Sequence, residues 1–232
     1  MNKRASFFAS SIGRKIIMAA TGVILFGFVI AHLVGNLQAY QGPERLNAYG
    51  EALRHYMALL WAARLTLLAA VGLHIWSAWS LTQDNRRARA VSYDRWEPQA
   101  STYASRTMRW SGVLLALFVV YHLLHFTTGN AHPDFVPGDV YHNFVTGFQN
   151  PLVSAFYILA MICLGFHLWH GLWSILQTFG VSNPRLDRAR YTLAAAVTTA
   201  IVLGNISFPV AVLTGVIRDE RHPRPALAQG VR

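Results

Sequence analysis

Five long apolar runs constrain this chain more than any other feature of its sequence. They lie approximately at residues 16–37, 59–81, 110–126, 151–179 and 191–217. Each has about the length that a helix needs to cross roughly 30 Å of hydrocarbon at 1.5 Å per residue. Only 13% of the 232 residues are charged, against about 25% in soluble domains. We therefore predict an all-α membrane protein, a single transmembrane domain over residues 1–232 with five transmembrane helices.

The charges between these runs predict the orientation. Four Lys or Arg precede the first run, six Arg lie in 82–109 against three acids, and three lie in 180–190 against one acid. The intervening connections have a net charge of zero or minus two, so the positive-inside rule places the N-terminus in the cytoplasm. The tail after 217 then lies outside and, with four Arg against two acids, fits the rule less well. This topology accounts for the formal charge of +10, and we expect no nucleic-acid partner.

The N-terminal segment and the single cysteine exclude two further interpretations. The first apolar run is longer than a signal-peptide core, so we expect a retained span rather than a cleaved signal. Cys163 is the one cysteine, which leaves no disulfide within the chain and no Cys-x-x-Cys-His motif for covalent haem attachment. Any haem is therefore held without a covalent bond to the chain.

Histidines stand inside four of the five apolar runs, where a group that can carry charge is costly and marks a candidate functional residue. In the predicted orientation His32 and His122 lie in the outer half of the membrane, and His74 and His167 lie in the inner half. Two imidazoles that face each other across a helix bundle provide the axial ligands of a b-type haem. We therefore predict that the first four helices form a bundle that binds two haems, at depths that differ by roughly 12 Å.

Other interpretations of these residues remain open at this level. His125 and His170 lie three residues after His122 and His167 and are alternative ligands. The two histidine pairs spaced by three residues are also compatible with a non-haem metal centre, although no intramembrane acid completes it. Arg64 is a candidate partner for a haem propionate in the outer half. For the remaining histidines we expect solvated or capping roles in loops and tails: His55, His132, His142 and His222.

Several short motifs together resemble the single-polypeptide, five-helix type of di-haem cytochrome b that anchors succinate dehydrogenase or fumarate reductase, respiratory complex II. The resemblance covers about residues 11–217. The motifs are Gly13-Arg14-Lys15, Ala31-His32-Leu33 with Gly35-Asn36-Leu37, Leu73-His74, Arg106-Thr107-Met108-Arg109-Trp110, Tyr121-His122-Leu123-Leu124-His125-Phe126, and Gly165-Phe166-His167 with Gly171-Leu172-Trp173.

This resemblance implies one ligand on each of the first four helices. His32 and His122 would hold a distal haem b, and His74 and His167 a proximal one. It also implies a bacterial cytoplasmic membrane, a quinone, commonly menaquinone, as substrate, and an FAD flavoprotein and an iron–sulfur protein docked on the cytoplasmic face. Ser11 and Lys15 are candidate contacts for the quinone or a propionate. Gly165 stands where some fumarate-reducing relatives carry a glutamate for proton transfer, so that route is not expected here.

Two other functions are retained as alternatives. The first is the cytochrome b subunit of another membrane oxidoreductase, such as a hydrogenase or formate dehydrogenase; the basic inner loop argues against a partner on the outer face. The second is a proton channel or transporter that uses histidines as a relay. It lacks the support of an internal repeat or of intramembrane acids.

Overall fold

The structure is a computed structural model and describes residues 7–88, 103–180, 185 and 187–221. Within these residues the chain forms only helices and the turns between them, as predicted. Five helices are long and apolar enough to cross a membrane. They are α1 (Ser11–Asn36, continued by the 3-10 turn Leu37–Gln41), α3 (Met57–Arg87), α4 (Tyr103–His122, continued by a π-turn, Leu123–Thr127), α6 (Pro151–Thr178) and α7 (Asp187–Leu213).

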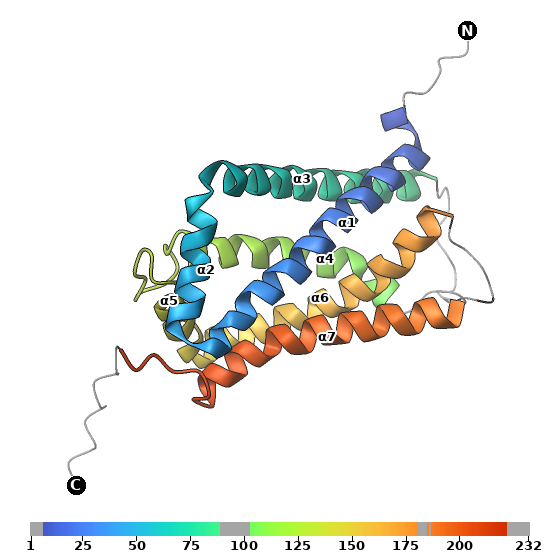
Figure 1. Ribbon diagram of the computed structural model, residues 1–232. Helices are drawn as coiled ribbons and strands as arrows, with labels where there is room; N and C mark the ends of the chain where they lie inside the picture. Colours follow the sequence, from blue (N-terminus) through green and yellow to red (C-terminus); the bar gives the residue numbers. More distant parts are fainter. Residues whose placement is uncertain (1–6, 89–102, 181–184, 186, 222–232) are drawn as a thin grey trace.

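Two shorter helices cover one end of the bundle (Figure 1). Helix α2 (Pro43–His55) lies between the first and second spans. Helix α5 (Val140–Gln149) was not predicted, because 127–150 was interpreted as a loop. Most residues of α5 are buried, and Phe144, Val145 and Phe148 form an aromatic core with Tyr157 of α6 and Phe208 of α7. This end of the bundle is therefore folded protein.

Local sequence signals explain where the helices begin and end. The Ser10 hydroxyl accepts a hydrogen bond from Gly13 N (2.9 Å) and caps α1. Gly42 has φ +93°, which turns the chain into α2 with Pro43 in its first turn. Asn150 caps α6 through Leu152 N (2.9 Å) and is followed by Pro151. At these three boundaries, therefore, a capping residue, a glycine or a proline sets the start of the helix.

The fifth span ends earlier than predicted, at Leu213 instead of 217. Gly215 has φ +76°, and the Val216 and Ile217 N–H groups both donate to Ala211 O, at 2.8 and 3.1 Å. These bonds close the last turn of α7 and satisfy a carbonyl that would otherwise lack a partner. The predicted span reached residue 217 because the residues of this turn are also largely apolar.

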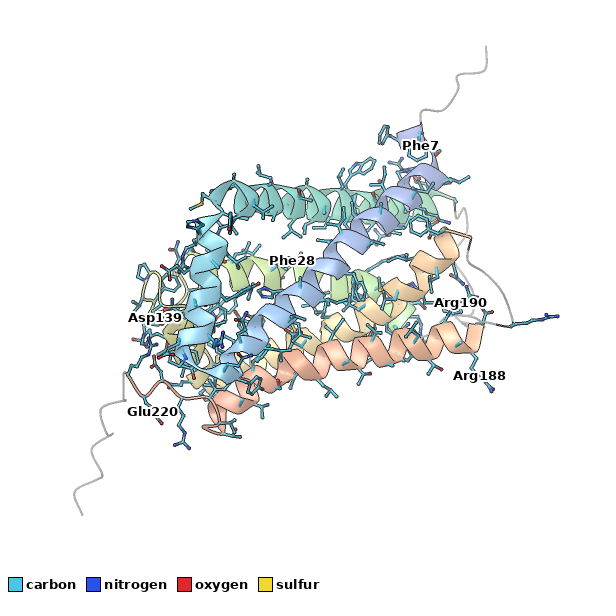
Figure 2. All side chains as sticks on the ribbon, viewed as in Figure 1. Phe7, Phe28, Asp139, Arg188, Arg190 and Glu220 are labelled. Carbon is cyan, nitrogen blue, oxygen red and sulfur yellow. The ribbon has the colours of Figure 1, made fainter. Side chains whose placement is uncertain are left out.

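Figure 1 shows α1 crossing the bundle between α3 and α7, with α4 and α6 behind it. Helix α1 packs against α3 and α6, and α6 packs against α4 and α7. The start of α1 and the end of α3 are joined by an ion pair between Arg14 and Asp84. In Figure 2, Arg188 and Arg190 lie at the end of the bundle where α1 begins, and Asp139 and Glu220 lie at the opposite end. The two ends therefore differ in charge as the sequence predicts.

Candidate functional site

The four predicted histidines come together as two pairs inside the bundle. His32 of α1 faces His122 at the end of α4, with ring centroids 5.7 Å apart and planes at 90°. His74 of α3 faces His167 of α6, with centroids 6.3 Å apart and planes at 56°. These are the pairs predicted from the depth of each histidine in the membrane.

The two histidines of each pair come from helices that do not otherwise pack together. Among the described residues, the close helix contacts join α1 to α3 and α6, and α4 to α6, but not α1 to α4 or α3 to α6. In the described part of the chain, helix α3 packs mainly against α1 and, near its start, against α2. The two imidazoles of each pair therefore face each other from helices whose backbones do not approach each other closely.

Groups on neighbouring helices orient the pair of His74 and His167, which is called the inner pair after its predicted depth. Nδ1 of His74 lies 3.1 Å from Met18 O and 3.2 Å from the Thr21 hydroxyl, both on α1. A carbonyl only accepts hydrogen bonds, so Nδ1 of His74 carries the proton and Nε2 keeps a free lone pair. Nδ1 of His167 lies 3.3 Å from the Ser111 hydroxyl of α4. Both rings thus leave Nε2 available as a ligand atom.

Aromatic side chains hold the pair of His32 and His122, which is called the outer pair after its predicted depth. His32 stacks on Phe28 at 5.3 Å, and His122 stacks on Phe118 at 5.8 Å. Nδ1 of His122 lies 3.4 Å from the hydroxyl of Tyr157, a residue of α6. Sequence reasoning missed Tyr157, since a hydroxyl 35 residues away gives no local signal.

The alternative ligand His125 contacts Tyr157 and His132, and the ring that faces His32 is that of His122. His125 is 2% exposed, and its Nδ1 lies 3.0 Å from the Tyr157 hydroxyl. A π-turn follows His122, in which Thr128 N donates to Leu123 O at 2.9 Å. The alternative His170 is half-buried on α6, and it is His167 that faces His74.

Two histidines for which we expected solvated or capping roles are buried instead. His132 is 5% exposed and stacks on His125 at 4.8 Å. His142 is 8% exposed, and its Nδ1 lies 3.3 Å from a carboxylate oxygen of Asp219. The reason is helix α5, which folds this connection onto the bundle. His55 is exposed as expected, and His222 lies outside the described residues.

A charged cluster ties the C-terminal segment to this end of the bundle. Arg221 forms ion pairs with Asp139 (3.0 Å) and Asp219 (2.9 Å), and Asn47 of α2 donates to Asp139 (2.9 Å). Burial by itself raises the pKa of Asp139, but the hydrogen bonds from Arg221, the His142 N–H and Asn47 outweigh it and lower the pKa to about 2. Residues up to 221 therefore lie on the same side as α5, where the topology placed the tail.

Comparison with known proteins identifies the kind of bundle. The family model of the succinate dehydrogenase/fumarate reductase transmembrane subunit matches residues 83–205, more than half of the chain. The chain belongs to this family. The matched residues include His122 and His167, one member of each pair, together with Ser111 and Tyr157. Comparison with curated proteins and with solved structures gives no significant match.

Transmembrane subunits of this kind raise the question whether the paired histidines fit haem. A metal ion bound by one imidazole nitrogen on each side, at about 2 Å, separates the ring centroids by roughly 6 Å. The observed 5.7 and 6.3 Å meet this requirement. A Cβ added to Gly22 would lie 3.6 Å from Cε1 of His74, and one added to Gly112 would lie 3.8 Å from Cε1 of His167. Small residues therefore flank the inner pair, and the donor set is compatible with a haem at both levels.

A non-haem metal centre has less support. Among the described residues, no group of three or more His, Cys, Asp or Glu side chains is arranged to hold a metal ion. The arrangement is one of separate pairs, which suits an iron that already has four ligands from a macrocycle.

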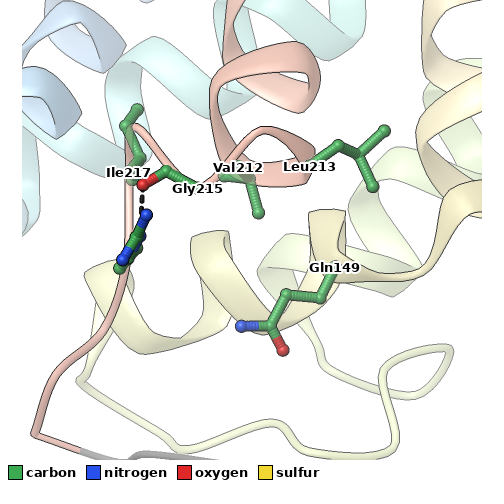
Figure 3. A pocket seen from close by; sticks show the side chains of 6 residues that line it. Gln149, Val212, Leu213, Gly215 and Ile217 are labelled. Atoms are coloured by element: carbon green, nitrogen blue, oxygen red, sulfur yellow. Dashed lines mark hydrogen bonds between the residues drawn. The ribbon is translucent and has the colours of Figure 1, made fainter.

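The other candidate residues lie at the ends of the spans. Arg64 is exposed near the start of α3, with its guanidinium 5.2 Å from the Trp61 ring. Ser11 and Lys15 are exposed in the first turns of α1. Figure 3 shows a small open pocket of about 240 Å³ where α5 and α7 end, lined by Gln149, Val212 and Arg218 among others. None of the four paired histidines lines it, so it is separate from the candidate site.

Proposed function

We propose that this chain is the membrane-anchor cytochrome b subunit of a succinate:quinone oxidoreductase. It would pass electrons between an iron–sulfur subunit and a quinone of the membrane through two b haems. The observation that carries the proposal is the pairing of four intramembrane histidines across helices that do not otherwise pack together. Family membership supports the class of complex.

In this proposal His32 and His122 hold the distal haem, and His74 and His167 hold the proximal one. Each haem would supply a one-electron carrier. The chain's own groups orient the ligands: Met18 O and Thr21 hold the His74 ring, Ser111 holds His167, and Tyr157 holds His122. A fixed Nδ1 bond sets the tautomer and ring direction of a ligating histidine and raises its basicity.

Contacts between the helices support two levels, at a separation somewhat larger than the roughly 12 Å predicted from the sequence. Thr21, bonded to His74, precedes His32 by eleven residues on α1, and Ser111, bonded to His167, precedes His122 by eleven residues on α4. Eleven helical residues correspond to roughly 16 Å along a helix axis. The two helices thus give the same separation, which is short enough to keep both pairs inside one bilayer.

We place the end that carries the start of α1 in the cytoplasm of a bacterium. Described basic residues gather there: Arg14, Lys15, Arg86, Arg87, Arg106, Arg109, Arg185, Arg188 and Arg190. The positive-inside rule favours this orientation. The FAD flavoprotein and the iron–sulfur subunit would dock on this face. Menaquinone is the proposed substrate, with Ser11 and Lys15 as candidate contacts to it or to a propionate, and Arg64 as a propionate partner at the outer level.

The test is a reduced-minus-oxidised optical spectrum of the complex, with haem quantified per polypeptide. Wild type is compared with His74→Ala, His122→Ala and the control His55→Ala, which changes an exposed histidine of α2. Two b haems in wild type and in the control, with each of the other substitutions disturbing a different haem, would support the proposal. A colourless wild-type protein would contradict it and favour the histidine proton relay.

A further inference from the structure

The hydroxyl of Tyr157 lies between two histidines of the outer level, His122 and His125. It is 3.4 Å from Nδ1 of His122 and 3.0 Å from Nδ1 of His125. Tyr157 is 5% exposed, and its ring packs edge-on against Phe118 (5.1 Å) and Phe148 (5.0 Å). The position of the hydroxyl is therefore fixed by the aromatic core, independently of either histidine.

The direction of the two hydrogen bonds follows from what each atom can donate. If Nε2 of His122 serves as the ligand atom, its Nδ1 carries a proton and donates to the Tyr157 oxygen. The single hydroxyl proton of Tyr157 is then free to be donated to Nδ1 of His125, which accepts it. The three groups form one chain, His122 to Tyr157 to His125, in which every bond has a donor and an acceptor.

His125 is held in place as the terminal acceptor of this chain. Its ring is stacked on Tyr121 at 5.4 Å and on His132 at 4.8 Å, with planes within about 20° of each other in both cases. A Cβ added at Gly147 of α5 would lie 2.9 Å from His125 Cε1, so the backbone of α5 also approaches it closely. His125, the last group of this hydrogen-bonded chain, is therefore held rigidly.

The inner pair has no such arrangement. Its Nδ1 atoms meet a backbone carbonyl and two small hydroxyls, from Met18, Thr21 and Ser111. The outer level alone, within the described residues, couples a paired histidine through a phenol to a second buried histidine. Because of this asymmetry, the hydrogen bonds to the outer pair differ from those to the inner pair.

We propose that Tyr157 and His125 are positioning residues for the outer pair: together they fix the ring of His122 perpendicular to His32 and set the midpoint potential of the outer haem. The inference rests on the proposed function. An acceptor on the Nδ1 proton of a ligating histidine raises its basicity and favours ferric iron. A Tyr157 oxygen that itself donates to His125 is a better acceptor, because hydrogen bonds in a chain polarise one another.

The test is a redox titration of the whole complex, followed by optical and EPR spectra, for wild type and Tyr157→Phe. The substitution keeps the ring and removes the hydroxyl. We expect two haems per polypeptide, a shift of the outer-haem potential to more positive values, a changed low-spin EPR signal from that haem, and an unchanged inner haem. The matched control is Tyr121→Phe: its hydroxyl makes no hydrogen bond to a histidine in the described part of the chain, and both potentials should stay as in wild type.

A second variant keeps the inference testable if Tyr157→Phe loses haem. His125→Phe preserves the stacking on Tyr121 and His132 but removes the acceptor, and should shift the outer potential in the same direction by a smaller amount. An unchanged outer potential and EPR signal in either variant, with both haems bound, would overturn the inference. Wild type without haem would instead overturn the proposed function, so the two failures are distinguished by the haem content of wild type.

Discussion

The imidazole of His32 stands perpendicular to that of His122, whereas the inner rings, His74 and His167, are tilted at 56°. Crossed imidazole planes leave two iron d orbitals close in energy and spread the g values of a low-spin ferric haem. We therefore expect two distinct low-spin EPR signals from the oxidised complex, with the more anisotropic one from the outer haem. His122→Ala should remove that signal and His74→Ala the other. The reverse assignment would contradict the ring geometry.

The two histidines at the end of α4 should respond differently to substitution. His122→Ala removes a predicted ligand, and we expect the outer haem to be lost while the inner one is retained. His125→Ala should retain both haems but reduce stability by about 1–3 kcal/mol, because it leaves the buried Tyr157 hydroxyl without its acceptor. Haem content per polypeptide and thermal unfolding measure the two effects. Loss of the outer haem in His125→Ala alone would reverse the assignment.

The sequence predicted the spans and the histidine partners because both depend on simple distances along a helix. Run length set the number of membrane crossings, and the place of each histidine within its run set its depth. In a five-helix bundle, a histidine has few possible partners that lie at the same depth on another helix. His32 was therefore paired with His122, and His74 with His167, before any contact was known.

Other features depend on side-chain directions that a sequence does not show. The π-turn after His122 contains an i to i+5 hydrogen bond from Thr128 to Leu123, which no residue pattern in the sequence indicates. Helix α5 is too short to form a long apolar run, so the sequence does not predict the burial of His142 within this helix or of His132 against it. Tyr157 is one of nine tyrosines in the sequence, and only its two hydrogen bonds place it between histidines.

Space beside the inner pair should be essential for haem binding. A Cβ at Gly22 would already be in van der Waals contact with the His74 ring, so the longer side chain of Gly22→Leu would occupy the volume next to it. We expect the inner haem to be lost and the outer one to remain, as shown by the optical spectrum and haem content. Ala20→Leu is the matched control: it adds a similar volume on an exposed face of α1. Equal haem loss in both variants would indicate a general packing defect.

The cluster around Asp139 should make the outer end sensitive to acid. Its pKa is lowered from 3.8 to about 2, so the ionised carboxylate stabilises the folded state above pH 3.8, and this contribution is lost as the pH falls towards 2. The shift corresponds to about 2 kcal/mol at neutral pH. We expect Asp139→Asn to unfold at a lower temperature than wild type near neutrality, with the difference narrowing on acidification. Asp134→Asn, which changes an exposed carboxylate of the same connection, is the control.

A difference between wild type and Asp139→Asn that stayed constant with pH would mean that Asp139 acts only as a neutral hydrogen-bond acceptor. The expected narrowing has a structural reason. Protonation removes the charge that holds Arg221, and Arg221 also pairs with Asp219, whose other oxygen lies 3.3 Å from His142. Acid should therefore loosen the C-terminal segment from α5 first, while the two histidine pairs, deeper in the bundle, keep their haems. Measuring haem content alongside unfolding would separate these two events.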